Sequence, residues 1–326
     1  MTRALVLNSG LAWAAYHVGA LRQFVQEKEM HFDLCAGSGL GAVHAAFVAC
    51  DAVEVLPSFW QHLSWRRLTT MNWRTPWRDG PLKLAPLKEF VARYVSESKL
   101  QDRGVKLMFN CLDTATGSET IFTYPGAETP LLEALTAAAT LPGLMPPLSG
   151  DGVHSEQWVD GTLVNSFMIQ TVLRQQPMAE LWAVAAAVPQ PDLAQPPKQY
   201  AHWRAIASRA LQLNQSQDVR LGLLFAQQFT TAVAAHQQVS RRLTEQLAEL
   251  ITDPEIKSHL KHELGKLYQP SAFPFKDACP TAVHCLTPSQ DLDYPLWRFR
   301  HKDLAFTQTL GYRDAQAYTA EGNLNP

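Results

Sequence analysis

The stretch that decides the fold is FDLCAGSGLGAVHAA, which occupies residues 32–46. It starts with a short apolar run typical of a buried strand, passes through three glycines within residues 37–41, and continues as an apolar run typical of a helix. A glycine-rich turn between a strand and a helix presents backbone N–H groups and the positive end of the helix dipole. The stretch therefore predicts a strand, a turn suited to an anion or a developing oxyanion, and a helix.

Strands and helices alternate on either side of this stretch. We expect strands at Ala4–Leu7, Phe32–Ala36, Lys106–Leu112, Glu119–Tyr124 and Leu181–Val188, with helices at Ala14–Glu27, Ala42–Cys50 and Leu131–Ala139. This order predicts an α/β fold of three layers, with a central, mostly parallel sheet between helices.

Near residue 190 the alternation of strand and helix patterns gives way to a proline-rich and then a glutamine-rich sequence. This change predicts a core over residues 1–190 and a helical C-terminal part over residues 191–326 that packs on the core within one domain. The extension is expected to begin with a linker at Pro189–Pro197 and continue with long helices at Tyr200–Gln269. A proline-rich, loop-like segment at Gln269–Pro295 and a helix around Tyr312–Tyr318 are expected to follow.

Composition excludes several classes of protein. The chain has 326 residues, 28 Lys and Arg against 30 Asp and Glu, and a formal net charge of -2, so no bulk electrostatic argument favours nucleic acid. The five cysteines lack metal-ligand spacing, so we expect no metal and no cofactor, and thiols kept reduced. The first apolar run is too short for a signal peptide, and none reaches the roughly 18 residues of a membrane span, so we expect a cytoplasmic protein.

Several blocks, in order along the chain, resemble the patatin-like phospholipase family. Residues 32–46 resemble its nucleophile elbow, G-x-S-x-G, and Trp158–Thr162 resembles its Asp-Gly-Gly/Ala motif. Further likenesses lie at residues 4–21 (first strand, oxyanion loop and helix), 112–117 (Thr-Asp and Thr-Gly block), 137–147 (segment before the second catalytic motif) and 310–315 (late Gly-Tyr helix). The resemblance implies a three-layer α/β/α patatin-like fold.

The resemblance also implies a serine–aspartate dyad, in which an elbow serine attacks an ester carbonyl and an aspartate acts as its base. The base falls on Asp160, whereas the nucleophile position holds Gly39, which has no hydroxyl. The family's oxyanion loop, Gly-Gly-Gly-x-Arg/Lys-Gly, falls on residues 9–14, where Gly10 is retained, Leu11 replaces a glycine and Trp13 replaces the basic residue. Loss of a serine nucleophile lowers the rate by a factor on the order of 10⁶. These departures predict a degenerate site.

Other residues near the two turns could still contact or attack a ligand. Ser38 is a substitute nucleophile or a turn residue capping the next helix, and Ser9 is a second hydroxyl or a loop residue. A water held by Asp160 is a third route. Leu40 and His44 lie at the start of the helix after the elbow, where they either contact a ligand or pack in the core.

The segment of residues 59–78 mixes tryptophans with arginines: Trp60, Trp65, Trp73 and Trp77 lie among Arg66, Arg67, Arg74 and Arg78. Such a mixture is typical of a cap helix packed on the core, of a lid over an acyl pocket, or of a membrane-interface patch.

The function that these features predict is lipid or acyl-group binding, with hydrolysis absent or very weak. The expected partner is a lipid, an acylated small molecule or an acylated protein, and the sequence indicates no oligomeric state. Two alternatives stay open: an active esterase or phospholipase that uses Ser38, Ser9 or a water held by Asp160, and a protein-interaction scaffold.

Overall fold

The computed structural model describes residues 2–149, 157–175, 177–189, 202–250, 256, 258–259, 262 and 280–320. Its centre is an eight-stranded sheet with the order β10-β9-β1-β2-β5-β8-β7, in which β6 also pairs with β5. The strands are β1 (Arg3–Leu7), β2 (Leu34–Gly37), β5 (Lys106–Asp113), β6 (Ser118–Tyr124), β7 (Leu148–Ser149), β8 (Gln157–Asp160), β9 (Glu180–Val184) and β10 (Ala282–Leu286). Pairing is parallel from β10 through β9, β1 and β2 to β5, and antiparallel for β6, β7 and β8. The predicted α/β architecture is confirmed.

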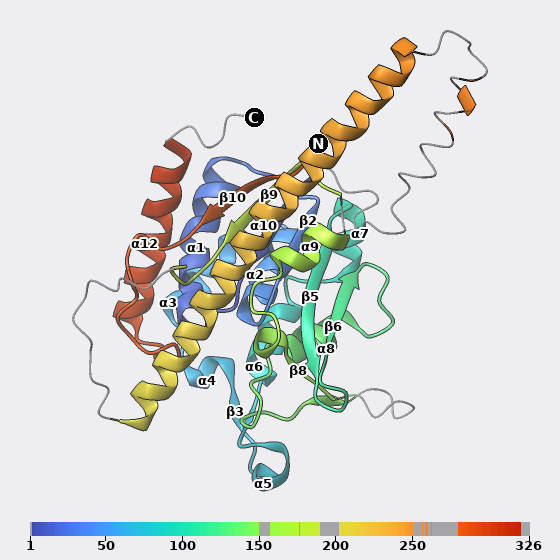
Figure 1. Cartoon of the computed structure of the whole chain (residues 1–326). Helices are drawn as coiled ribbons and strands as arrows, with labels where there is room; N and C mark the ends of the chain where they lie inside the picture. Colours follow the sequence, from blue (N-terminus) through green and yellow to red (C-terminus); the bar gives the residue numbers. More distant parts are fainter. Residues whose placement is uncertain are drawn as a thin grey trace.

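Helices lie on both sides of the sheet, and the long helix α10 crosses it diagonally (Figure 1). The longer helices are α1 (Ala15–Leu21), α2 (Leu40–Ala49), α6 (Ala85–Ala92), α7 (Glu97–Arg103), α8 (Leu131–Ala138), α9 (Ile169–Gln175), α10 (Trp203–Leu250) and α12 (His301–Ala320). The short ones are η1 (Leu11–Ala14), η2 (Arg22–Glu27), η3 (Val53–Val55), α3 (Leu56–Gln61), α4 (Trp65–Leu68), α5 (Pro76–Asp79) and η4 (Gly161–Leu163). The three-layer arrangement follows from these two helical layers around the sheet.

The central strands are buried on both faces, which explains their continuous apolar sequence. Residues 4–7 of β1 are all buried, because β2 and β9 flank the strand and helices cover its two faces. Leu7 lies opposite Gly37 of β2 and Val184 of β9. The carboxyl ends of these strands therefore meet at one edge of the sheet, and the glycine-rich turns follow there.

The C-terminal part contributes to the same sheet and core. Helix α12 packs on α1, where Gly19 and Gly311 allow close backbone approach: a Cβ at either position would overlap the main chain of the other helix. The expectation of a loop over Gln269–Pro295 is wrong for β10, which pairs in parallel with β9. The helix expected around Tyr312–Tyr318 is the second half of the 20-residue α12.

Strand β8 and the region after residue 189 differ in how far the sequence predicted them. β8 follows no apolar run and was not expected, although it carries Asp160 at its end. The predicted linker lies mostly outside the described residues, and so does Cys279. No helix in the described part of the chain is long and apolar enough to cross a membrane.

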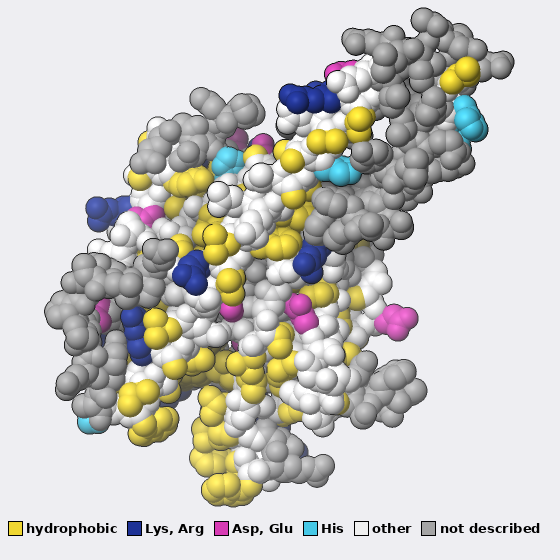
Figure 2. All heavy atoms as spheres, in the orientation of Figure 1, with side chains coloured by type: hydrophobic (Ala, Val, Ile, Leu, Met, Phe, Trp, Pro, Cys, Tyr) yellow, Lys and Arg dark blue, Asp and Glu magenta, His cyan; other side chains and the backbone are white. Residues whose placement is uncertain are grey.

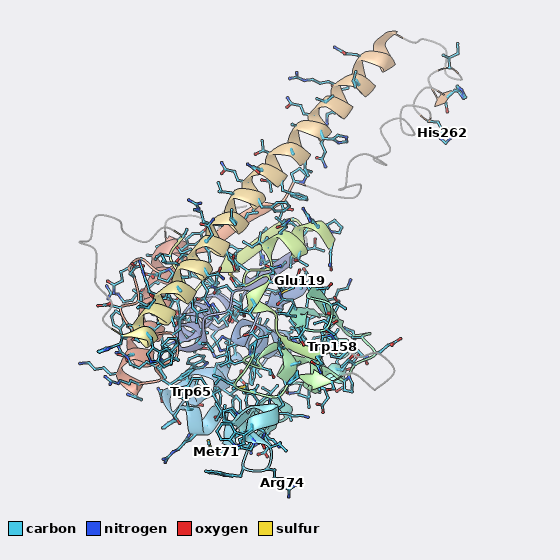
Figure 3. The ribbon with its side chains drawn as sticks, turned by 60° about the horizontal axis from the view of Figure 1, so that its bottom comes forward. Trp65, Met71, Arg74, Glu119, Trp158 and His262 are labelled. Atoms are coloured by element: carbon cyan, nitrogen blue, oxygen red, sulfur yellow. The ribbon has the colours of Figure 1, made fainter. Side chains whose placement is uncertain are left out.

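A two-stranded hairpin projects from the body at the bottom of Figure 1. It consists of β3 (Thr70–Met71), α5 and β4 (Leu82–Lys83), and it is anchored where the Leu82 N–H donates to the Leu144 carbonyl at 3.0 Å. Figure 2 shows hydrophobic side chains along one side of this projection, and Figure 3 places Met71 and Arg74 on it. The projection thus presents both apolar and cationic side chains.

Candidate active site

The turn between β2 and α2 has the strained geometry of a nucleophile elbow, although a glycine stands at its tip. Gly39 adopts φ 56° and ψ -130°, a conformation that L side chains rarely take. A Cβ at Gly37 or Gly41 would overlap the backbone of the turn or of the first loop. The glycine pattern therefore specifies the path of the elbow.

Two hydroxyls surround the tip. A Cβ built on Gly39 would overlap the Ser9 hydroxyl and would lie 3.0 Å from Thr162 Oγ1. The side-chain space at position 39 is therefore partly filled by Ser9 and Thr162, residues that come from two different loops. Thr162 was not among the candidates identified from the sequence.

Asp160 lies at the end of β8, opposite Cys111 of β5. Its backbone N–H donates to the Thr140 carbonyl at 3.0 Å, and its Oδ1 accepts from the Thr162 N–H at 2.9 Å and from Thr162 Oγ1 at 2.5 Å. Burial raises the pKa of Asp160 to about 6, and the two Thr162 hydrogen bonds partly offset that rise. A carboxylate with this pKa is suited to accept a proton near neutral pH.

The first loop keeps its path despite the loss of glycines. Leu11 has φ 43°, a left-handed conformation that costs a non-glycine residue about 1–2 kcal/mol. The Ser9 N–H donates to the Ser166 carbonyl at 3.1 Å, which fixes the loop against the segment after Asp160. At the starts of η1 and α2, the N–H groups of Ala12 and Gly41 already donate to the Leu296 and Ser38 carbonyls. Among the described residues, the N–H groups of Leu11 and of the buried Leu40 have no backbone acceptor, and these two amides are the ones left for an oxyanion.

Trp13, a candidate ligand contact, is directed into the interior. It is 5% exposed, and its Nε1 donates to the Tyr294 carbonyl at 3.0 Å. The indole therefore joins the first loop to the C-terminal part of the chain. The guanidinium or ammonium group that the family pattern places here has no counterpart at this position.

Ser38 is fully buried beside the tip. Its hydroxyl donates to the Asn165 carbonyl at 3.1 Å and lies 3.5 Å from Thr162 Oγ1. The Ser38 hydroxyl has no hydrogen bond to Asp160 and instead holds the elbow against the segment that follows β8.

His44 belongs to a buried chain of polar groups beneath the elbow. Its Nε2 accepts from Trp60 Nε1 at 2.8 Å, its Nδ1 lies 3.3 Å from His17 Nδ1, and His17 Nε2 lies 3.0 Å from Asn8 Oδ1. One tautomer set satisfies all three contacts: His44 donates from Nδ1, and His17 donates from Nε2. Burial lowers the pKa of both imidazoles, to about 3 for His44, so both are neutral. Both ring nitrogens of His44 thus contact protein groups.

Asn110 is a second residue that the sequence reasoning missed. It is buried on β5, and its Nδ2 donates to the Asn165 carbonyl at 2.9 Å and to the Gly161 carbonyl at 3.3 Å. Gly161 packs directly on it, since a Cβ there would lie 2.6 Å from Asn110 Cγ. Asn110 therefore positions the loop that carries Asp160. The signal in the sequence was a single polar residue within an apolar strand.

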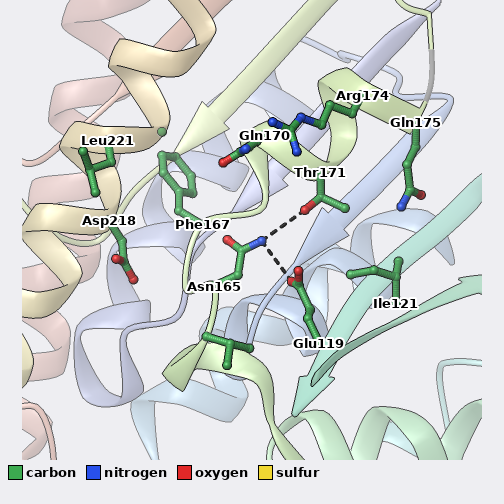
Figure 4. A pocket seen from close by; sticks show the side chains of 12 residues that line it. Glu119, Ile121, Asn165, Phe167, Gln170, Thr171, Arg174, Gln175, Asp218 and Leu221 are labelled. Atoms are coloured by element: carbon green, nitrogen blue, oxygen red, sulfur yellow. Dashed lines mark hydrogen bonds between the residues drawn. The ribbon is translucent and has the colours of Figure 1, made fainter. Parts of the chain in front are cut away.

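A cavity of about 450 Å³ lies beside the site, between β6, α9 and α10 (Figure 4). Asn165, which also touches the elbow, donates from Nδ2 to Glu119 and to Thr171 on its wall. Arg174 and Asp218 add charges of opposite sign. Such a wall suits a polar head group better than an acyl chain. Two exposed apolar side chains, Val164 and Leu221, also line the cavity, and Leu163, next to Val164 in the chain, is 56% exposed.

The described residues contain no cluster of His, Cys, Asp and Glu that could hold a metal ion. Four free cysteines lie in this part of the chain, namely Cys35, Cys50, Cys111 and Cys285. Burial raises the pKa of each of these four thiols, which keeps them protonated and unreactive near neutral pH.

Three comparisons with known proteins show what the chain is similar to. A family model described as Patatin-like phospholipase matches residues 5–173, from β1 to α9, a range that includes Gly39, Asp160 and both loops. One similar solved structure is the crystal structure of VipD from Legionella pneumophila, with 10% sequence identity and a TM-score of 0.45 over 98% of this chain and 67% of that chain. No protein of curated function matches significantly.

Proposed function

Because the chain belongs to the patatin-like phospholipase family, we propose that it binds lipid acyl groups at the elbow and hydrolyses them very slowly or not at all. The observation that carries this proposal is Gly39, which keeps the elbow conformation without a nucleophile. Asp160 and the N–H groups of Leu11 and Leu40, which have no backbone acceptor among the described residues, supply the other features of the site. The site can therefore still bind an ester carbonyl, but residue 39 has no hydroxyl that could attack it and form an acyl-enzyme.

Exposed apolar groups next to the site are consistent with an acyl ligand. Leu163 and Val164 lie shortly after Asp160 in the chain, and Val164 and Leu221 of α10 both line the cavity. Burial of such side chains against an acyl chain yields about 25 cal/mol for each Å² of apolar surface removed from water. The bound species is a lipid, an acylated small molecule or an acylated protein.

The side chains of the projecting hairpin suit contact with a lipid surface, from which the protein could take its ligand. Trp77 is 99% exposed, Trp73 is 81% exposed, and Met71 and Arg74 are also exposed. Exposed tryptophans next to cationic side chains are typical of contact with an anionic membrane interface. By contrast, Trp60 is buried and Trp65 is half-buried, with its Nε1 donating to the Trp297 carbonyl at 3.0 Å. The Trp and Arg segment thus divides into a structural half and an exposed half.

Ligand binding is tested with the purified protein. Lipid is extracted and identified by mass spectrometry, and the delipidated protein is titrated with a dansyl-labelled fatty acid. We expect saturable binding that Leu163→Glu weakens and Val239→Glu, an exposed control further along α10, leaves unchanged. Absence of extracted lipid together with absence of probe binding would favour the scaffold alternative.

Membrane contact is tested separately by sedimentation with phosphatidylglycerol–phosphatidylcholine vesicles. We expect the double substitution Trp73→Ser and Trp77→Ser to lower vesicle binding several-fold. Trp203→Ser, which changes an exposed tryptophan on α10, serves as the matched control. Equal binding by both variants would contradict the role of the hairpin.

A further inference from the structure

We propose that the Thr162 hydroxyl, held on Asp160, is the nucleophile for the slow cleavage of acyl esters at this site, an inference that rests on the proposed binding of acyl groups. Thr162 is partly exposed, whereas Asp160 is buried, so of this pair the threonine is the residue that solvent or a ligand can reach. The distance of 2.5 Å between Thr162 Oγ1 and Asp160 Oδ1 is that of a nucleophile in contact with its base.

The position of this hydroxyl relative to the tip supports the assignment. Thr162 Oγ1 lies 3.0 Å from the place where a Cβ at Gly39 would stand, so it occupies the neighbourhood in which a side chain at the tip would end. The Leu40 N–H directly follows Gly39, and the Leu11 N–H lies in the loop that carries Ser9; neither has a backbone acceptor among the described residues. An ester carbonyl bound to these amides therefore lies within reach of Thr162.

Comparison of residues 39 and 162 with the family motifs also supports Thr162 as the nucleophile. The tip, where a serine would stand, is a glycine, whereas residue 162, where the motif has glycine or alanine, is a threonine. One hydroxyl is thus lost and another gained within the same few ångströms.

The other two hydroxyls fit this role less well. Ser38 is fully buried and donates to the Asn165 carbonyl. Ser9 borders the tip, but among the described residues the hydroxyl that bonds Asp160 belongs to Thr162. A serine or threonine hydroxyl without a base in contact is a weak nucleophile.

The chemical step balances with these groups alone. As Thr162 Oγ1 bonds to the ester carbonyl carbon, its proton passes to Asp160 and the carbonyl oxygen becomes the oxyanion. Collapse of this intermediate breaks the bond to the alcohol, which leaves with the proton from Asp160. Water then adds to the acyl carbon, gives its proton to Asp160 and releases the acid, and the Thr162 oxygen regains the proton. The threonine methyl group crowds the attack, which is consistent with a slow reaction.

The test compares Thr162→Val with Thr162→Ser in the full chain. Valine matches threonine in shape but lacks the hydroxyl, and serine keeps it. With p-nitrophenyl butyrate, we expect valine to lower turnover at least tenfold and serine to retain or raise it. Thr114→Val, on the turn after β5, controls for loss of a hydroxyl elsewhere. A fluorophosphonate probe followed by peptide mapping should label Thr162 in the unmodified protein.

Three results would overturn the proposal: turnover that survives Thr162→Val, a label that maps to Ser9 or Ser38, or no turnover above background with the unmodified chain. Each is distinguishable from failure of acyl binding, because the titration with labelled fatty acid is read without any catalysis. A Thr162→Val protein that binds the fatty acid normally and loses turnover would support the assignment and exclude simple misfolding.

Discussion

Substitution of Gly39 by serine restores a hydroxyl at the tip of the elbow and, for structural reasons, destabilises the fold. Gly39 has φ 56° and ψ -130°, and a side chain held in so sparsely populated a region costs about 1–3 kcal/mol. The new Cβ also overlaps the Ser9 hydroxyl, which must rotate away. At about 2 °C for each kcal/mol in a chain of this size, we expect the melting temperature to fall by roughly 2–6 °C.

The same substitution should raise esterase activity. Removal of a serine nucleophile lowers the rate by a factor on the order of 10⁶, and an elbow that still carries its base and amides should regain part of that factor. We expect a gain of at least 100-fold in kcat/KM on p-nitrophenyl esters, a gain that Asp160→Ala abolishes. Gly39→Ala is the matched control, because alanine brings the same Cβ and backbone strain without the hydroxyl.

The outcome separates two parts of the reasoning. If Gly39→Ser and Gly39→Ala both leave the melting temperature unchanged, the strain assigned to the elbow is wrong. If the unmodified protein is as active as Gly39→Ser, the site is not degenerate and the proposed slow hydrolysis is refuted.

Three further predictions concern the surroundings of the tip. Asp160→Asn should raise the free energy of unfolding by about 3 kcal/mol at pH 8. The folded-state pKa of Asp160, about 6, exceeds the ordinary 3.8, so ionisation of the buried carboxylate destabilises the unmodified protein as the pH rises. The gain should nearly vanish at pH 4, and urea unfolding at the two pH values measures it. Gly161→Ala should displace Asn110 and lower both the melting temperature and the affinity for labelled fatty acid, so no change in either would contradict the positioning role. His44→Gln should destabilise the fold by about 2 kcal/mol less at pH 5 than at pH 7. Below pH 6.5 the His44 imidazole takes up a proton in the unfolded chain but not in the folded one, so the unmodified protein loses stability there. An effect independent of pH in urea unfolding would refute the neutral state of the buried His44 imidazole.

The sequence allowed the sheet and the two glycine-rich turns to be predicted because their signals are local. Residues 32–46 combine an apolar run, a turn and a helix within one window, and the structure places β2, the elbow and α2 there. Strand β8 has no such signal, since its four residues derive their pairing from β5 and β7. The strand β10 lay within a proline-rich segment, and its partner β9 is about a hundred residues earlier in the chain.

The site shows the same division. Gly39 and Asp160 could be located from motifs, whereas the contacts around them depend on side-chain direction in three dimensions. Thr162 lies in the Asp160 motif, yet its proximity to the elbow follows only from the packing of two segments more than a hundred residues apart. Trp13 was expected near a ligand, but its indole bonds the Tyr294 carbonyl, which no local pattern indicates.

Native mass spectrometry of the unmodified protein mixed with a long-chain acyl ester, followed over time, tests the central claim most directly. The account predicts a non-covalent complex with intact ester that persists for many minutes, with little free acid formed. It would be contradicted by the absence of any complex, or by conversion of the bound ester to acid and alcohol at rates near the roughly 10 s⁻¹ of a typical enzyme.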